Sequence, residues 1–255
     1  MNHDIVLIGI GEIGGILAKG FLRAGYAVHP VGRDTDMRHL CEMLPAPQLV
    51  VIAVGEKDLS GVLDEVPEVW RSRLCLLQNE LLPEDWSGIP QPTVISIWFE
   101  KKPGTDAKVI MASPAYGPGA KLLSDALEGI GIPVRVLQDE AELLFQLVVK
   151  NVYILTTNIA GLRTGGTVMQ LWNEHREFAQ SVAREVIQLQ EALTRNPLDA
   201  TRLIESLVEA FHGDPEHRCM GRSAPARLQR ALEHAHRLGL ELPTLENVNE
   251  TSGVA

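Results

Sequence analysis

Lys150 has the surroundings that most clearly suggest chemistry in this sequence. It interrupts a mostly apolar run, with residues 143–149 before it and residues 152–155 after it. A lysine is costly to bury without a partner or a role. Desolvation also lowers its pKa, so such a lysine could donate or accept a proton near neutral pH. The alternative is an ordinary lysine that extends its ammonium group to solvent from a partly exposed helix face.

Asn158 follows Lys150 by eight residues in the same predicted helix. At about 100° per residue, the two side chains lie about 80° apart around the helix and two turns apart along it. They could therefore line one wall of a cleft, in which an amine and an amide would face a polar substrate. The alternative is that Asn158 simply ends the helix.

Three glycines near the start of the chain form a second candidate site. Gly9-x-Gly11-x-x-Gly14 follows an apolar run that begins after Asp4, and sequence compatible with a helix follows it. In a dinucleotide-binding turn, Gly9 would allow the sharp turn, Gly11 would let a pyrophosphate approach, and Gly14 would let helix and strand pack closely. The free N–H groups of the helix start, at Glu12 and Ile13, would meet the phosphates. The alternative is a glycine turn in another kind of α/β protein.

The end of the second predicted strand bears on which dinucleotide would bind. This strand, residues 27–31, is followed by Gly32, Arg33 and Asp34. An NAD site usually has an acidic residue at the strand end, where a glycine stands here. Arg33 could bind a 2′-phosphate, which favours NADP, whereas Asp34 keeps NAD open. Arg33 could also be a solvated loop residue.

The spacing of apolar residues predicts the elements that would position these groups. Strands and helices alternate in the first half, which predicts a mostly parallel, doubly wound (Rossmann) sheet in an α/β domain. The second half predicts only helices. We therefore expect a dinucleotide-binding domain over 1–139 and a helical substrate and dimerisation domain over 140–255. The predicted strands are 4–8, 27–31, 49–54, 74–77, 93–99, 108–112 and 134–137, and the predicted helices are 13–24, 58–70, 119–130, 140–162, 168–194, 199–211 and 224–238. Residues 113–119 are expected to form a turn-rich loop, and residues 247–255 a frayed tail.

Composition excludes several classes of function. The net charge of the 255-residue chain is −10, so we expect no broad basic surface and no nucleic-acid partner. No signal peptide is recognisable, and no uninterrupted apolar stretch reaches the roughly 18 residues that span a bilayer. Cys41, Cys75 and Cys219 are predicted to be thiols in a reducing cytoplasm. His212 and His217 lie near Cys219, but their spacing fits no standard zinc pattern, so no metal site is expected.

These features together resemble the ketopantoate reductase family, within the superfamily whose helical domain is similar to the C-terminal domain of 6-phosphogluconate dehydrogenase. The resemblance covers nearly the whole chain and depends on short motifs: the glycine loop, Gln78-Asn79, Lys150 with Asn158, Gly221-Arg222, and Gly239 with Pro243-Thr244. It implies reduction of a 2-oxo acid by NADPH and a homodimer formed through the helical domain. It also implies a role for each matching residue: the pyrophosphate at Gly9, Gly11 and Gly14, the 2′-phosphate at Arg33, the nicotinamide half near Asn79, the general acid at Lys150, and the substrate at Asn158.

Four positions depart from the family pattern. Ile154 stands where the family has an asparagine, and Pro225 stands where it has a glutamate that binds the substrate hydroxyl. Glu80 replaces the glycine of the QNG turn, and Gly55 replaces a common lysine. Ketopantoate itself is therefore not the expected substrate.

The segment after Gly221 leaves two hypotheses open. Ser223 with Arg222 or Arg227 could line an altered pocket, although a helix that starts at Ser223 explains the same residues. An alternative to an enzyme is a sensor or scaffold that binds nucleotide without turnover.

Overall fold

The computed structural model describes residues 3–252, and its first half is built on a seven-stranded sheet. The strand order is β2-β1-β3-β4-β5-β8-β9. All neighbouring strands are parallel except β5 and β8, which are antiparallel. The strands of this sheet are β1 Asp4–Ile8, β2 Ala27–Val31, β3 Leu49–Ile52, β4 Leu74–Leu76, β5 Thr93–Ile95, β8 Ser113–Tyr116 and β9 Val134–Val136.

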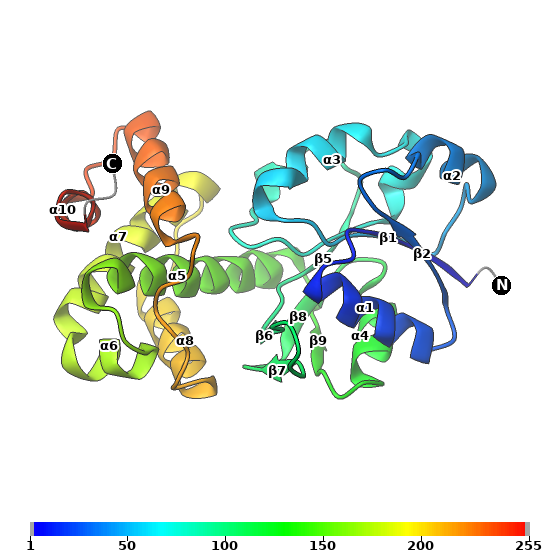
Figure 1. Cartoon of the computed structure of the whole chain (residues 1–255). Coiled ribbons are helices and arrows are strands. Elements are labelled where there is room, and N and C mark those ends of the chain that lie inside the picture. The colour runs from blue at the N-terminus through cyan, green and yellow to red at the C-terminus, as the bar shows by residue number, and fades with distance from the viewer. Residues whose placement is uncertain (1–2, 253–255) are drawn as a thin grey trace. The chain divides into compact units, whose positions relative to one another are not determined.

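Continuous apolar sequence explains the centre of this sheet. All four residues of β3 and all three of β4 are buried, as expected where helices cover both faces of a parallel sheet. Figure 1 shows α1 (Glu12–Arg23) and α4 (Ala120–Glu128) on one face, and α2 (Met37–Met43) and α3 (Leu59–Glu65) on the other. The predicted doubly wound α/β domain is therefore confirmed.

Two predictions about the strands of this half are wrong. Residues 93–99 do not form one strand: the chain leaves the sheet after β5, and β6 (Phe99–Glu100) pairs with β7 (Lys108–Val109) in a separate hairpin. Residues 113–119 are not a loop throughout, because β8 begins at Ser113 and its first three residues are buried in the sheet. The sequence predicted a loop here because Pro114, Gly117 and Pro118 are residues typical of turns.

The first unit also contains short helices that the periodicity did not resolve. The single helix predicted over 58–70 is divided into η1 (Glu56–Asp58), α3 and η2 (Glu68–Arg73), because Pro67 cannot continue α3. Helix α2 was not predicted, although Asp36 accepts hydrogen bonds from the backbone N–H groups of Arg38 and His39 as its N-cap. A further short helix, η3, spans Pro83–Trp86.

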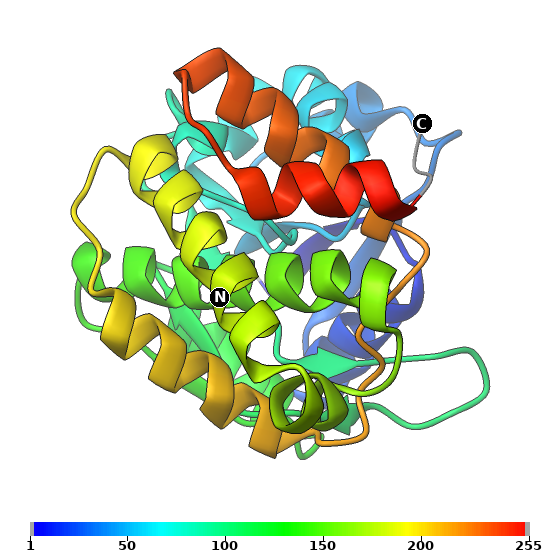
Figure 2. The ribbon, with the colours of Figure 1, turned by 90° about the vertical axis from the view of Figure 1, so that its left-hand side faces the viewer.

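The second half is helical, and α7 lies at its centre. Helix α7 packs against α6, α8, α9 and α10, which Figure 2 shows from the side of this unit. The helices are α5 Glu140–Thr164, α6 Val168–Glu174, α7 Arg176–Thr194, α8 Ala200–Gly213, α9 Ala224–Leu238 and α10 Pro243–Ser252. The predicted helix over 168–194 is broken at His175, and residues 247–252 belong to α10 instead of a frayed tail. Residues 253–255 lie outside the described part of the chain.

Contacts divide the chain into two compact units, residues 1–146 and 147–255. The division falls within α5, whereas the predicted boundary after residue 139 coincides with the start of that helix. By length and composition α5 could cross a membrane, but 78% of its most apolar 18-residue window is buried inside the protein. Such burial is typical of the core helix of a globular protein.

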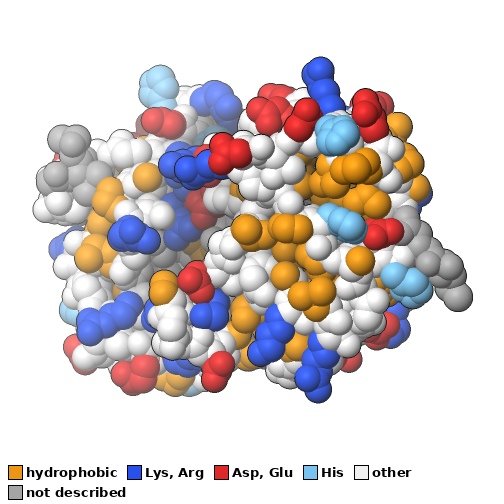
Figure 3. Space-filling model, turned by 45° about the vertical axis from the view of Figure 1, so that its right-hand side comes forward, with side chains coloured by type: hydrophobic (Ala, Val, Ile, Leu, Met, Phe, Trp, Pro, Cys, Tyr) orange, Lys and Arg blue, Asp and Glu red, His pale blue; other side chains and the backbone are white. Residues whose placement is uncertain are grey.

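The three cysteines are thiols, as the sequence predicted, and acidic and basic side chains are mixed on one face of the molecule. Cys41, Cys75 and Cys219 are free thiols, and all three are buried. On the face shown in Figure 3, lysine and arginine side chains are interspersed with acidic ones and do not form one broad basic area.

Candidate functional site

The predicted residues fall into two groups, one in each unit. In the first unit, β2 lies on one side of β1, and β3, which follows β2 in the chain, lies on the other side of β1. The loops that follow these parallel strands lie at the same edge of the sheet, at the point where the strand order reverses. Open α/β sheets bind their ligands at this position.

Gly9 and Gly14 are required by the packing of the loop itself. Gly9 has φ +89°, and a Cβ there would lie 2.6 Å from the carbonyl oxygen of Ala53 at the end of β3. A Cβ on Gly14 would clash with the carbonyl oxygen of Gly9, so α1 could not pack this closely to β1. These two glycines shape the loop whether or not a ligand is bound.

Gly11 differs, because nothing within the protein requires a glycine there. Its φ is −69°, and a Cβ would meet no atom of residues 3–252 within 4 Å. Gly11 is exposed and is the N-cap of α1, where no described side chain accepts from the first N–H groups. An open space in front of uncapped N–H groups fits a phosphate, which the positive end of the helix dipole also favours.

Glu12 would be an unfavourable neighbour for a phosphate if its charge were not offset. Its carboxylate lies 3.1 Å from the ammonium group of Lys101, which the β6–β7 hairpin brings to the loop. Both residues line a cavity of about 480 Å³ beside Gly11 and Gly15. Ile13, the next residue of the helix, is partly buried and packs against the core, so at Ile13 only the backbone N–H could serve a ligand.

Arg33 and Asn79 lie in loops that follow two of the parallel strands. Arg33 is exposed in a turn after β2, which is closed by Thr35 N–H donating to the Gly32 carbonyl. Asn79 follows β4 and donates from Nδ2 to Oε1 of Glu56 at 3.1 Å. Its neighbour Gln78 is buried and donates to the carbonyl of Ile52, so it joins the ends of β3 and β4. Gln78 is thus explained by structure, whereas Asn79 presents an exposed amide.

In the second unit, Lys150 is partly buried on α5. Burial, and to a smaller extent the positive charge of Arg227, lower its pKa to about 7. Its ammonium nitrogen lies 5.8 Å from the ring centre of the buried Tyr153, within range of a cation–π attraction. The altered pKa suits a group that exchanges a proton near neutral pH.

Asn158 is 8% exposed, and hydrogen bonds engage both ends of its amide. Nδ2 donates to the carbonyl of Ile154 at 2.9 Å, and Oδ1 accepts from Nη1 of Arg227 at 3.2 Å. Arg227 thus joins Lys150 and Asn158 in one polar cluster, although the sequence indicated it only as one possible lining of an altered pocket. We call these three residues the Lys150 cluster.

Gly161 explains how Arg227 reaches α5. A Cβ at Gly161 would lie 2.8 Å from the Cβ of Cys219 and 3.0 Å from the backbone nitrogen of Met220. The missing side chain therefore lets residues 219–221 pack directly on α5, one turn beyond Asn158. Helix α9 begins three residues after this contact, and Arg227 lies in its first turns.

The two departures expected to matter most are apolar in the structure as well. Ile154 is buried, and its backbone carbonyl accepts the hydrogen bond from Asn158. Pro225 lies in the first turn of α9, where a missing N–H costs nothing because the first N–H groups of a helix have no intrahelical partner. The carboxylate that the resemblance would place at position 225 is absent from this chain.

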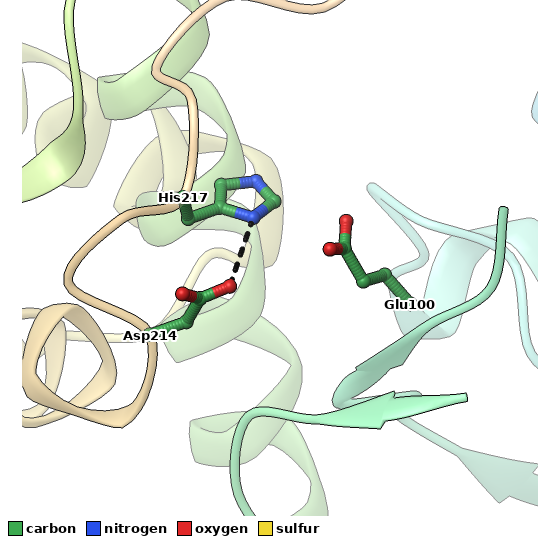
Figure 4. Close-up of side chains that lie close together, drawn as sticks. All are labelled: Glu100, Asp214 and His217. Carbon is green, nitrogen blue, oxygen red and sulfur yellow. Dashed lines mark ion pairs between the residues drawn. The ribbon is translucent and has the colours of Figure 1, made fainter. Parts of the chain in front are cut away.

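Asp214 and His217 form a further polar pair in the second unit. Asp214 is 2% exposed, and one of its carboxylate oxygens lies 3.6 Å from Nδ1 of His217 (Figure 4). The His217 ring lies 6.0 Å from the Tyr153 ring, centre to centre. Glu100, the third side chain in Figure 4, belongs to the first unit, where it pairs with Lys102.

Comparison with known proteins defines the class of fold. The sequence matches no family model, and it matches no curated protein. Solved structures do match: a 2-dehydropantoate 2-reductase from Methylococcus capsulatus is 14% identical, with a TM-score of 0.74 over 98% of this chain and 96% of that chain. The resemblance to the ketopantoate (2-dehydropantoate) reductases is thereby confirmed at the level of the fold.

Two further structures show the range of proteins with this fold. A dimeric ketopantoate reductase from Staphylococcus aureus is 14% identical, with a TM-score of 0.65 over 98% of this chain and 97% of that chain. A D-mandelate dehydrogenase, in a ternary structure with NADH and anilino(oxo)acetate, is 13% identical, with a TM-score of 0.65 over the same shares. At such identities the likeness establishes the fold, and the chemistry has to be argued from the residues.

Proposed function

We propose that this protein is an NAD(P)H-dependent oxidoreductase that reduces a small 2-oxo acid to the 2-hydroxy acid. The fold supports this proposal, because proteins described as 2-dehydropantoate reductases and as a mandelate dehydrogenase share it. The glycine loop supports it as well. The observation that carries the proposal is Lys150, an amine kept in an apolar helix with a pKa of about 7.

The first unit would hold the cofactor. The loop from Gly9 to Gly14, with the N–H groups of Glu12 and Ile13, would bind the pyrophosphate. Arg33 would bind a 2′-phosphate, which favours NADPH, and Asn79 would lie near the nicotinamide half. When bound, the reduced nicotinamide supplies the hydride that the carbonyl carbon accepts.

Lys150 would act as the general acid. Its ammonium group would donate a hydrogen bond to the carbonyl oxygen, and then its proton, as negative charge develops on that oxygen. A cation at this place stabilises the developing alkoxide, and it does so most strongly where water is excluded. A pKa of about 7 leaves a large protonated fraction at neutral pH while keeping the proton easy to transfer.

Binding and turnover test the proposal separately. NADPH or NADH at millimolar concentration should raise the melting temperature, since a ligand that binds only the folded state stabilises it. A panel of 2-oxo acids should then oxidise the cofactor, and Lys150→Ala should lower turnover by about 10²-fold or more. Lys121→Ala, at an exposed position of α4, is the control. Unchanged turnover in Lys150→Ala would remove the proposed acid.

A second candidate function is a nucleotide-binding sensor or scaffold without turnover. Ile154 and Pro225 favour it, because they remove two polar groups that the resemblance would place near the substrate. Tight NADPH binding, with no cofactor oxidation across the whole panel, would support this second candidate and exclude the reductase.

The proposal includes a cytoplasmic location and a homodimer. The three free, buried thiols suit a reducing compartment, and a protein of the same fold is described as dimeric. Sedimentation equilibrium of the purified protein would show a mass of about 56 kDa for two copies of the 28.0 kDa chain.

A further inference from the structure

We propose that Arg227 binds the carboxylate of the substrate, and that Asn158 is a positioning residue that holds Arg227 in place. This inference rests on the proposed reduction of a 2-oxo acid and names the group that would recognise its acid function. It changes the expectation for Asn158, which the resemblance placed on the substrate directly.

The hydrogen bonds of Asn158 give the first argument. Its amide nitrogen donates back to the Ile154 carbonyl of its own helix, and its amide oxygen accepts from Arg227. An amide held at both ends serves to orient its partner. The guanidinium group carries its N–H donors in one plane, and Asn158 accepts from one of them. Arg227 is thereby fixed as a planar fork, which matches the shape of a carboxylate.

The electrostatics of the cluster give the second argument. Arg227 lies in the first turns of α9, where the helix dipole is positive and a cation is unfavourable. Ser223, the N-cap of that helix, makes no side-chain cap hydrogen bond, and the Ala224 N–H donates to the Gly221 carbonyl. Lys150 adds another positive charge, close enough for Arg227 to lower its pKa. A carboxylate bound at Arg227 would therefore also be attracted by the positive charge of Lys150.

The chemistry of a 2-oxo acid gives the third argument. Its carboxylate is bonded to the carbonyl carbon, so the group that protonates the carbonyl oxygen and the group that binds the acid must be neighbours. Lys150 and Arg227 meet this requirement, one for each function. A simple ketone or aldehyde would need only the lysine. Pro225, at the start of the same helix, has no side-chain hydrogen-bonding group, so we expect a 2-oxo acid with an apolar side chain.

A pair of substrates with the same carbonyl group tests Arg227. For wild type and Arg227→Gln, kcat/KM is compared between a 2-oxo acid with an apolar side chain and its neutral methyl ester. We expect Arg227→Gln to lose about 100-fold on the acid, mainly through KM, and less than about 5-fold on the ester. Arg237→Gln is the matched control, because Arg237 is an exposed arginine of the same helix. Equal losses on acid and ester would overturn the proposal.

Two more variants separate positioning from folding. Asn158→Ala should raise KM for the acid by about 10-fold and leave the ester unaffected, since it only loosens Arg227. Arg227→Lys keeps the charge without the planar fork and should fall between wild type and Arg227→Gln. If Arg227→Gln fails to fold, these two variants decide the question, and full activity of both on the acid would contradict the inference.

Oxamate distinguishes failure of this inference from failure of the proposed function. Oxamate has the carboxylate and a carbonyl group but is not reduced, so its binding requires no turnover. In the presence of NADPH, it should raise the melting temperature of wild type and of Arg237→Gln but not that of Arg227→Gln. Oxamate binding through Arg227 without any turnover would keep the carboxylate site and reject the reductase. Turnover of a 2-oxo acid that Arg227→Gln leaves unchanged would keep the reductase and reject Arg227 as the carboxylate site.

Discussion

The guanidinium group of Arg227 donates to the amide oxygen of Asn158 at 3.2 Å, across 69 residues of sequence. This hydrogen bond joins the start of α9 to the middle of α5, on which Lys150 also lies. It therefore brings a second cation to a lysine whose pKa burial has already lowered. The lowered pKa of Lys150 therefore depends in part on where this hydrogen bond holds Arg227.

The rate of reduction should depend on pH through Lys150. With a pKa of about 7, the ammonium form that donates the proton is lost as pH rises, so the rate of hydride transfer should fall above about pH 7. Arg227→Gln removes a like charge, so the apparent pKa should rise and the fall should begin at higher pH. Single-turnover measurements between pH 5.5 and pH 9.5, with the ester as substrate, would show both effects. A shift to lower pH in the variant would contradict the assignment.

Replacement of Lys150 by methionine should stabilise the fold. In the unfolded chain a lysine has a pKa near 10.5, so between about pH 7 and that value the unfolded state binds more protons than the folded state. The wild-type free energy of unfolding therefore rises with pH across this window, and the charged lysine costs most at and below pH 7. We expect Lys150→Met to gain about 1–3 kcal/mol at pH 6 and less at pH 9, by urea denaturation. The exposed Lys19→Met should change little at either pH.

Glu80 should be improved by glycine. Its φ is +59°, in the left-handed region that costs a side chain about 1–2 kcal/mol. The turn after Asn79 therefore has a backbone conformation that favours glycine, although its residue is a glutamate. We expect Glu80→Gly to raise the free energy of unfolding by about 0.5–1 kcal/mol, because relief of strain exceeds the extra entropy of the unfolded chain. Glu84→Gly, in η3, should lower it instead; equal destabilisation by both variants would show that Glu80 is not strained.

The glycine loop yields a matched pair of variants. Gly14→Ala should lower the free energy of unfolding by about 2–4 kcal/mol, since its Cβ would clash with the carbonyl of Gly9. Gly11→Ala should cost less than about 1 kcal/mol, because its Cβ enters open space, but it should weaken NADPH binding about 10-fold or more. Denaturation and fluorescence titration measure the two effects. Normal NADPH affinity in Gly11→Ala would place the phosphates elsewhere.

Sequence patterns predicted the elements that depend on interactions between residues close together in the chain. The strands up to residue 76, the glycine turn and the unusual setting of Lys150 could all be found, because each depends on neighbours within a few residues. Strand β8 was missed, because its pairing with β5 outweighs its proline. Helix α10 was missed because residues 247–252 are mostly polar, while Leu245 and Val248 anchor it in the core.

Arg227 could not be assigned from sequence for a different reason. Its partner Asn158 is 69 residues away, and nothing near Arg227 indicates that α9 starts against α5. The sequence offered only the departure at Pro225, which showed that the pocket differs without showing what replaces the lost carboxylate. Contacts between distant segments depend on packing, and packing has no local pattern to read.

Gly161 has a consequence for the reading of divergent sequences. Because no side chain fits between α5 and residues 219–221, a single added methyl group would push away the segment that delivers Arg227. The glycine eleven residues after Lys150 therefore marks the point where a much later segment of this chain packs on the helix. A search for such a pair, in apolar helices that are hard to align, could find other chains with this fold and few shared residues.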